Sequence, residues 1–349
     1  MRLDTLTWTA PEPAALDLAV AADLRRLIDG KAKPLGALGR LETLAVQLGA
    51  IQGRLDPQAD RAVVLLFAGD HGLTEDGVSS YPREVTAAMV RLILDGRACV
   101  SALARAAGVE VRVIDVGVAS DLAPHPLLRD AKVRAGTRNA AREPAMTADE
   151  CARALTCGVE AAAAAIAAGA DVIALGEMGI GNTASASLLL HRLGPAPLDD
   201  CIGLGAGQDD EGLARKRRVL AAAAARCDAE APFEVLRQFG GLEIAGMAGA
   251  ALGAAAARRP VVVDGFISTE AVLVAARLQP RVLDACIFAH ASAERGHRIM
   301  LQSLGAQPLL DLDLRLGEGT GAVLALPILK AAAAMVREVA SLAEVLGQA

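Results

Sequence analysis

Glu318 stands between glycines in GEGTGA, residues 317–322, where proton transfer could take place. A carboxylate acts as a general base when its pKa is tuned close to the working pH, and glycine lets a ligand approach the backbone. Taken singly, Glu318 could also be an ordinary surface charge, and the glycine-rich segment ALGEMGIGNTASAS, residues 174–187, could be a tight turn between a strand and a helix. Acid–base chemistry is therefore a hypothesis that needs support from other segments.

Two glycine-rich segments could bind a phosphate group. Gly179 and Gly181 would let backbone N–H groups surround an anion at a helix N-terminus. In IGLGAGQDDEGLARKRRVL, residues 202–220, Lys216 could add a positive charge, although a solvent-exposed helix face is the alternative. Neither segment has the spacing of a P-loop or of a dinucleotide-binding loop.

Asp70 and His71 invite a metal or acid–base interpretation, and Ser292 with His297 could form a nucleophilic site. A single Asp–His pair favours structural hydrogen bonds over a metal, and the GxSxG elbow is missing. The cysteines form no CxxC pair, so we expect reduced thiols and no metal site. They are Cys99, Cys151, Cys157, Cys201, Cys227 and Cys286.

Strands must position these residues at one edge of a sheet. Apolar runs begin at Ala62, Val111, Asp171, Arg259 and Leu283, and long helical stretches separate them. Such runs predict an α/β fold with a parallel sheet covered by helices on both faces. Ligands of these sheets bind beyond the carboxyl ends of the strands. This edge should carry Asp70, His71, Glu177, Asp264 and His290.

The composition excludes several classes of protein. The net charge of −6 and an aromatic content of 2% argue against a nucleic-acid partner. The mean hydropathy is +0.38, but the longest uncharged apolar run, residues 244–257, is shorter than the ~20 residues of a membrane span. The N-terminus has no apolar signal segment. We therefore expect a soluble, cytoplasmic protein without a membrane partner.

Ten segments in order and spacing resemble the nicotinate-nucleotide:dimethylbenzimidazole phosphoribosyltransferase family. They are KPLGALGRLE, AGDHG, GVSSYPREVT, GTRN, GEMGIGNT, DDEGLARK, LRQFGGLEIAGMAGA, VVVDGFIS, AHASAERGH and LGEGTGA. The resemblance implies transfer of phosphoribose from nicotinate mononucleotide to dimethylbenzimidazole, without a cofactor. It also implies a homodimer, a Rossmann-like domain of residues 56–324, and a small helical domain that combines residues 1–55 with 325–349.

The resemblance also implies roles for individual residues. Glu318 is similar to the general base of the family, and Glu177 to a second active-site acid. Residues expected around the phosphate, ribose and nicotinate are Gly179, Gly181, Asn182, Gly205, Gly207, Lys216, Asp264, Ser292 and His297. Residues expected around the incoming base are Ser80, Tyr81, Met178 and Leu316. Because the chain has one tyrosine and few other rings, we expect mainly aliphatic groups and methionine around that base.

Three departures from the family pattern remove polar donors. Ala88 replaces a glutamine, Ala184 replaces a threonine, and GLGAG at residues 203–207 replaces GRGTG. They leave open the preferred base and the affinity for the nucleotide. They motivate two alternatives, a homologue that binds a nucleotide or azole without turnover and a family member that activates a different base. A further alternative is a metal-dependent hydrolase that uses Asp70, His71 and His297.

Overall fold

The computed structural model describes residues 8–203, 205, 207 and 209–348 of the chain. Its main sheet has six strands, all parallel, in the order β3-β2-β1-β4-β5-β6. They are β1 (Ala62–Gly69), β2 (Glu110–Gly117), β3 (Leu128–Asp130), β4 (Val172–Met178), β5 (Val261–Val263) and β6 (Cys286–Phe288). This is the Rossmann order, in which β2 and β3 lie on one side of β1, and β4, β5 and β6 lie on the other, so the strand order switches between β1 and β4. The α/β prediction is therefore confirmed.

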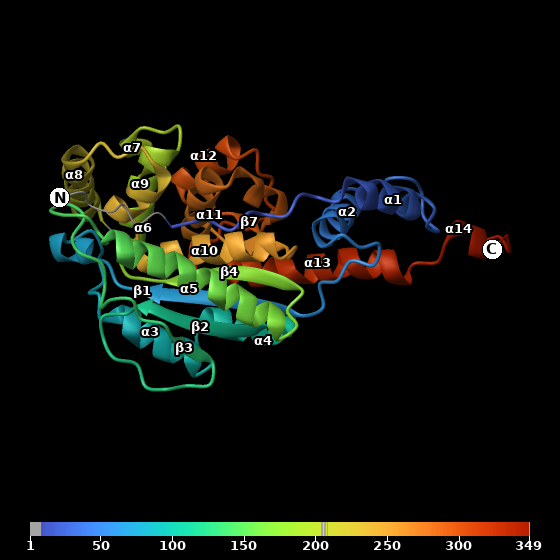
Figure 1. The fold of residues 1–349 in the computed structure, drawn as a ribbon, viewed down its shortest axis with the longest axis horizontal. Coiled ribbons are helices and arrows are strands. Elements are labelled where there is room, and N and C mark those ends of the chain that lie inside the picture. Colours follow the sequence, from blue (N-terminus) through green and yellow to red (C-terminus); the bar gives the residue numbers. More distant parts are fainter. Residues whose placement is uncertain (1–7, 204, 206, 208, 349) are drawn as a thin grey trace.

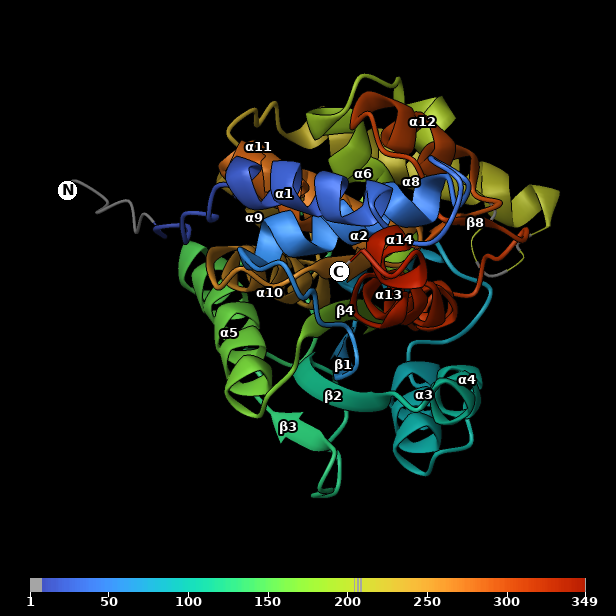
Figure 2. The same ribbon diagram turned by 90° about the vertical axis from the view of Figure 1, so that its right-hand side faces the viewer.

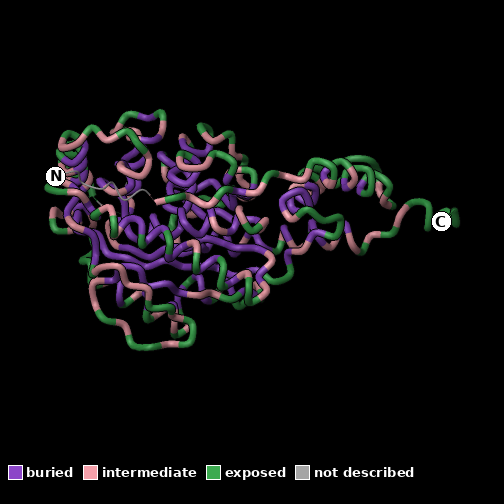
Figure 3. The backbone as a smooth tube through the Cα atoms, viewed as in Figure 1, coloured by how far each residue is buried: buried purple, intermediate pink, exposed green. Residues whose placement is uncertain are grey.

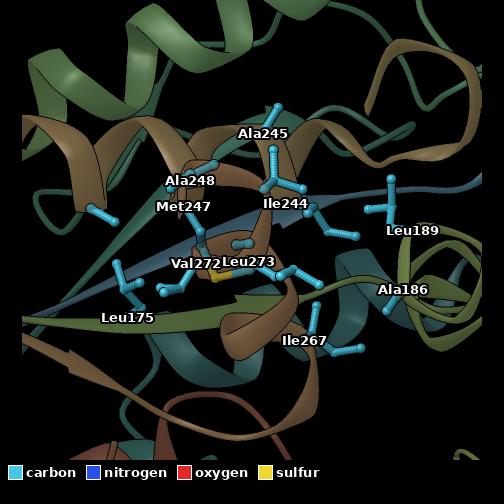
Figure 4. Close-up of a cluster of buried hydrophobic side chains, with 14 of the residues drawn as sticks. Leu175, Ala186, Leu189, Ile244, Ala245, Met247, Ala248, Ile267, Val272 and Leu273 are labelled. Atoms are coloured by element: carbon cyan, nitrogen blue, oxygen red, sulfur yellow. The ribbon is translucent and has the colours of Figure 1, made fainter. Parts of the chain in front are cut away.

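Alternate side chains of the central strands enter two separate hydrophobic cores. Leu65, Phe67 and Leu175 pack on one face, against α5 (Ala148–Ala167), α10 (Leu242–Ala256), α11 (Phe266–Leu278) and α6 (Asn182–Leu193). Leu66 and Ala174 pack on the other face, against α2 (Arg40–Gln52), α3 (Val85–Leu94), α4 (Cys99–Ala107) and α13 (Thr320–Glu338). Figure 4 shows the first core, where Leu175 meets the side chains of Met247 and Val272. Burial on both faces explains the continuous apolar runs in the sequence.

Small residues let α5 and α10 approach closely. A methyl group on Gly158 would lie 1.8 Å from the carbonyl oxygen of Gly246, and one on Gly249 would lie 1.9 Å from that of Leu155. Two backbones in such contact leave no room for a β-carbon. The glycines at these positions therefore serve helix packing.

The remaining elements connect the sheet and its covering helices. The helices are α1 (Leu18–Asp29), α7 (Leu198–Cys201), α8 (Asp210–Arg226), α9 (Pro232–Phe239), α12 (Arg295–Ser303) and α14 (Leu342–Val345). Two 3-10 helices cover Gly72–Asp76 and Pro280–Ala285, and β7 (His290–Ala291) pairs with β8 (Leu310–Asp311). The strand β3 and the β7–β8 pair were not predicted, because two or three residues show no periodicity.

The helices nearest the two ends of the chain lie side by side, α1 and α2 beside α14 and the last part of α13 (Figures 1 and 2). The amide of Ala32 donates to the carbonyl oxygen of Ala340 at 2.9 Å, and that of Leu342 donates to Gly30 at 2.8 Å. Helices α1, α2 and α14 project at one end of the molecule, where the outer surface is exposed and the contact between helices is buried (Figure 3). These contacts agree with a helical unit built from both ends. The domain division at residues 55 and 325 stays a prediction.

Helix α13 is long and apolar enough to cross a membrane, by length and composition alone. However, 61% of its most apolar window is buried inside the protein. Residues such as Val323 and Leu326 contact the sheet core and have no exposed surface. Burial in the core accounts for the apolar composition of this helix.

Candidate active site

A cavity of about 740 Å³ lies at the carboxyl ends of β4 and β5. Part of its lining is polar and comes from α6, α8 and the loop after β7. Another part is apolar and comes from the segment between residues 78 and 89, from β4 and from residues 314–316. Of the residues that the sequence suggested, those lining the cavity are Tyr81, Glu177, Met178, Gly179, Gly181, Asn182, Gly205, Lys216, Asp264, His290, Ser292, Leu316 and Glu318.

Three predicted residues lie outside the cavity lining. Ser80 is exposed on the segment before α3, and it is Ser79 that faces the cavity. Gly207 is exposed, and a methyl group there would contact nothing within 4 Å. His297 is fully buried. Its Nδ1 accepts a hydrogen bond from the Ser292 amide at 2.9 Å, so it lies next to the backbone of Ser292. A role for His297 is thus indirect, through the position of Ser292.

Glu318 has a left-handed backbone conformation, with φ of 61°, between two glycines that also have positive φ. A non-glycine residue in this conformation is strained by about 1–2 kcal/mol. The conformation turns the carboxylate toward α4, where the Val100 amide donates a hydrogen bond to Oε2 at 3.4 Å. Burial, with a smaller contribution from repulsion by Asp264, raises the Glu318 pKa above its ordinary value. A higher pKa makes the carboxylate a stronger base.

Glu177 is the last but one residue of β4 and is buried. Its Oε2 accepts a hydrogen bond from the side-chain amide of Asn182, and its Oε1 accepts one from the Glu318 amide. Burial and repulsion by Asp264 and Glu243 raise its pKa to about 8. Glu177 is therefore mostly protonated at neutral pH. The Glu177 pKa is raised further than that of Glu318, which allows these two carboxyl groups different roles.

Asp264 follows β5 and holds the beginning of α13. Its two oxygens accept hydrogen bonds from the backbone amides of Gly319 at 3.1 Å and Ala322 at 2.8 Å. Nε2 of His290 lies 3.6 Å from Oδ1. Since Gly319 follows Glu318 directly, Asp264 positions the proposed base as well as facing the cavity.

Lys216 projects from α8 into the polar part of the cavity with only 1% of its surface exposed. Its ammonium group donates hydrogen bonds to Oγ1 of Thr183 at 2.9 Å and to the carbonyl oxygen of Gly203 at 3.1 Å. Burial lowers its pKa to about 8, and the nearby carboxylate of Glu294 opposes this effect. Thr183 and Glu294 occur in the sequence motifs but were not predicted as site residues. Only the fold brings them to Lys216.

The apolar part of the cavity combines the predicted Tyr81, Met178 and Leu316 with side chains that sequence reasoning did not assign. The added residues are Val78, Val85, Met89, Ile180 and Leu314. Tyr81 and Leu316 are 51% and 53% exposed at the opening. Ala88 is exposed and does not line the cavity, although its neighbour Met89 does. No sequence pattern distinguishes such aliphatic residues from ordinary core residues.

The structure separates the residues of the hydrolase hypothesis. Asp70 accepts a hydrogen bond from the Ala119 amide at 2.7 Å, and His71 binds Ser185 and Glu243. His297 instead contacts Oγ1 of Thr269 at 3.0 Å, and burial lowers its pKa to about 3. Among the described residues, no three His, Cys, Asp or Glu side chains gather where they could hold a metal ion. These residues have structural partners, and they do not converge on one centre.

Comparisons with known proteins agree with this geometry. A family model described as phosphoribosyltransferase matches residues 14–345. The nicotinate-nucleotide--dimethylbenzimidazole phosphoribosyltransferases of Cupriavidus taiwanensis and Geobacter sulfurreducens are 53% and 46% identical to the chain. These alignments cover 95% and 97% of this chain, and 96% and 97% of the relatives. The crystal structure of CobT from Thermus thermophilus superposes with a TM-score of 0.90 at 46% identity, covering 95% of this chain and 99% of that one. The chain belongs to the nicotinate-nucleotide–dimethylbenzimidazole phosphoribosyltransferase family.

Proposed function

We propose that this enzyme transfers the phosphoribosyl group of nicotinate mononucleotide to 5,6-dimethylbenzimidazole or a related base. The products are α-ribazole 5′-phosphate and nicotinate, in the assembly of the cobalamin nucleotide loop. One observation carries the proposal. A single cavity joins a buried ammonium group, the three buried carboxyl groups of Glu177, Asp264 and Glu318, and an apolar lining, in a chain whose relatives bear this enzyme name.

The polar part of the cavity suits the nucleotide. The backbone at Gly179 and Gly181 leads into the N-terminus of α6, where the helix dipole favours an anion. Lys216 supplies a positive charge for the phosphate, and Gly205 lies beside it, since a methyl group there would be 3.5 Å from Nζ. Asn182 and Ser292 add polar groups to this part of the lining. We assign these residues to the phosphate and ribose.

The apolar part suits a flat heteroaromatic base. Tyr81, Met178 and Leu316 offer one ring, a thioether and an aliphatic side chain around a planar ligand. In this proposal the base attacks C1′ of the ribose through one ring nitrogen, while its other ring nitrogen gives a proton to Glu318. The bond from C1′ to the pyridinium nitrogen breaks, and its electron pair leaves with nicotinate as a neutral ring nitrogen. Holding the rings on opposite faces of the ribose gives inversion and supplies rate through positioning.

Mass spectrometry tests the proposed reaction. The protein is incubated with nicotinate mononucleotide and dimethylbenzimidazole, and we expect α-ribazole 5′-phosphate to form. The Glu318→Gln variant is the matched control because it keeps the shape of the side chain. Tight binding of both substrates without product would instead identify a binding homologue. A competition among benzimidazoles, adenine and phenolic bases then identifies the preferred base, and full activity in excess EDTA would exclude a metal-dependent reaction.

We also propose a homodimer in the cytoplasm. Exposed apolar side chains on the helical unit, Leu35, Leu342, Val345 and Leu346, support association with a second copy. The six free cysteines support a reducing compartment. Sedimentation analysis of the wild type and of Val345→Lys tests the assembly. A wild type that remains monomeric at the concentrations used in the assay would contradict the homodimer.

A further inference from the structure

A chain of three buried side chains lies behind the turn that follows β4. Nδ1 of His71 is 2.9 Å from Oγ of Ser185, and Nε2 of His71 is 2.6 Å from Oε1 of Glu243. None of the three is more than 1% exposed. His71 follows β1, while the other two residues come from α6 and α10. The proposed reaction uses none of them.

We assign His71 the neutral Nε2–H tautomer, in which the Ser185 hydroxyl donates to Nδ1 and Nε2–H donates to the carboxylate of Glu243. This arrangement leaves one negative charge on the three side chains, in the first turn of α10, where the helix dipole stabilises it. The second oxygen of Glu243 has no hydrogen-bond partner among the described residues. A buried carboxylate with a free oxygen is costly, and its field is little screened.

This charge lies close to the end of the strand that carries Glu177. A methyl group on Gly179 would be 3.4 Å from both Oε1 of Glu243 and Nε2 of His71, and Gly179 is two residues beyond Glu177. The titratable groups that act on Glu177 or line the cavity with it are Asp264, Glu243, Glu318, Glu294, Asp313, Lys216, His290 and Arg315, and His71 lies behind Gly179. Two backbone amides already bind Asp264. Of the two negative charges that act on Glu177, Asp264 acts more strongly, and Glu243 is the one that lies outside the cavity lining.

We propose that Glu243, held by His71 and Ser185, is a positioning residue that keeps the Glu177 carboxyl protonated while Glu318 accepts the proton of the incoming base. The inference rests on the proposed function for its catalytic meaning. Repulsion by Glu243 contributes to the raised pKa of Glu177. With Glu177 neutral, the cavity keeps one carboxylate able to act as base and one carboxyl group able to donate a hydrogen bond to the nucleotide.

The test follows the ionisation of Glu177 itself. The infrared C=O band of a protonated carboxyl group is recorded against pH in the free enzyme, and Glu177→Gln identifies the band by removing it. We expect the wild-type band to persist to about pH 8. In Glu243→Gln, which keeps an oxygen that accepts from His71, the band should disappear about one pH unit lower, and the alkaline limb of the pH–kcat/KM profile should shift with it. Glu243→Asp, which keeps the charge, should restore the wild-type values.

Glu270→Gln is the matched control. Glu270 is also fully buried, and neither of its oxygens has a hydrogen-bond partner among the described residues, but it does not act on Glu177. Its variant should leave the Glu177 band unchanged. An identical band titration in Glu243→Gln and wild type would overturn the inference. His71→Gln is a second variant, which serves if Glu243→Gln does not fold. A shift of the Glu177 band to higher pH in His71→Gln would also overturn the inference, because it would mean that His71 carries a positive charge in the wild type.

The two proposals fail separately. The infrared titration needs no substrate, so it reports on Glu243 even if the enzyme does not use nicotinate mononucleotide. Product formation with an unshifted band would refute the inference and leave the proposed function intact.

Discussion

The backbone amide of Glu318 donates a hydrogen bond to Oε1 of Glu177, with 3.3 Å between the two atoms and 141 positions between the residues in the chain. The contact requires glycine at position 317, since a methyl group there would lie 2.2 Å from the same oxygen. The end of β4 and the residue before α13 are thereby held together through the backbone. The Glu318 carboxylate remains available to the cavity.

The first prediction concerns Glu318 as the base. Glu318→Gln should lower kcat about 100- to 10,000-fold, because general base catalysis contributes this much to typical reactions. The dissociation constant of nicotinate mononucleotide, measured by calorimetry, should change little. An unchanged kcat would refute the assignment.

The second prediction concerns Lys216 and the nucleotide. Lys216→Ala should weaken binding of nicotinate mononucleotide about 10- to 100-fold, the value of a hydrogen bond to a charged group. Binding of dimethylbenzimidazole should be nearly unaffected. Calorimetry with each substrate separately provides the check, and a loss confined to the azole would contradict the role.

The third prediction is a pH dependence of nucleotide binding. Burial lowers the Lys216 pKa to about 8, so in the free enzyme the ammonium loses its proton above that pH. Because the phosphate binds the protonated form, the dissociation constant should be flat from about pH 7 to 8 and then rise by up to tenfold per pH unit. Lys216→Arg, which stays charged, should make the rise less steep, and the part that remains belongs to Glu177, whose pKa is also raised to about 8. A rise as steep in this variant as in the wild type would contradict the role of Lys216.

The fourth prediction tests Asp264 as a residue that positions Glu318. In Asp264→Asn, one of the two amides, Gly319 or Ala322, faces an NH₂ group and loses its acceptor, at a cost of about 1–3 kcal/mol. Because this loss would displace Glu318, kcat should fall on the order of 100-fold, while the KM for the nucleotide should change little. Steady-state kinetics and thermal unfolding measure both effects. A large rise in KM with unchanged kcat would instead favour direct ribose binding.

The fifth prediction concerns the contact between α5 and α10. Gly158→Ala should destabilise the protein by about 1–3 kcal/mol, because the added methyl group would lie 1.8 Å from the carbonyl oxygen of Gly246. Helix propensity alone predicts the opposite sign, a gain of about 1 kcal/mol. The exposed Ala164→Gly control in the same helix should show only that propensity term, as a loss. Denaturant unfolding distinguishes the two outcomes.

The sequence by itself determined the fold class and the family. Apolar runs starting near Ala62, Val111, Asp171, Arg259 and Leu283 become β1, β2, β4, β5 and β6, because strands buried on both faces need continuous apolar residues. The polar endings of these runs had to gather at one edge of a parallel sheet. The order and spacing of the ten motifs along the chain were sufficient to identify the family.

Only the tertiary structure decided which polar residues share a cavity and which are buried behind it. His71 and His297 occur in motifs as suggestive as that of Lys216, yet Lys216 lines the cavity and the two histidines do not. The aliphatic residues of the cavity, such as Val78 and Met89, look like core residues in the sequence. Periodicity along the chain reports which face of an element is apolar. Contacts between residues more than a hundred positions apart depend on how the elements pack, and so do the local burial and charge that set each pKa.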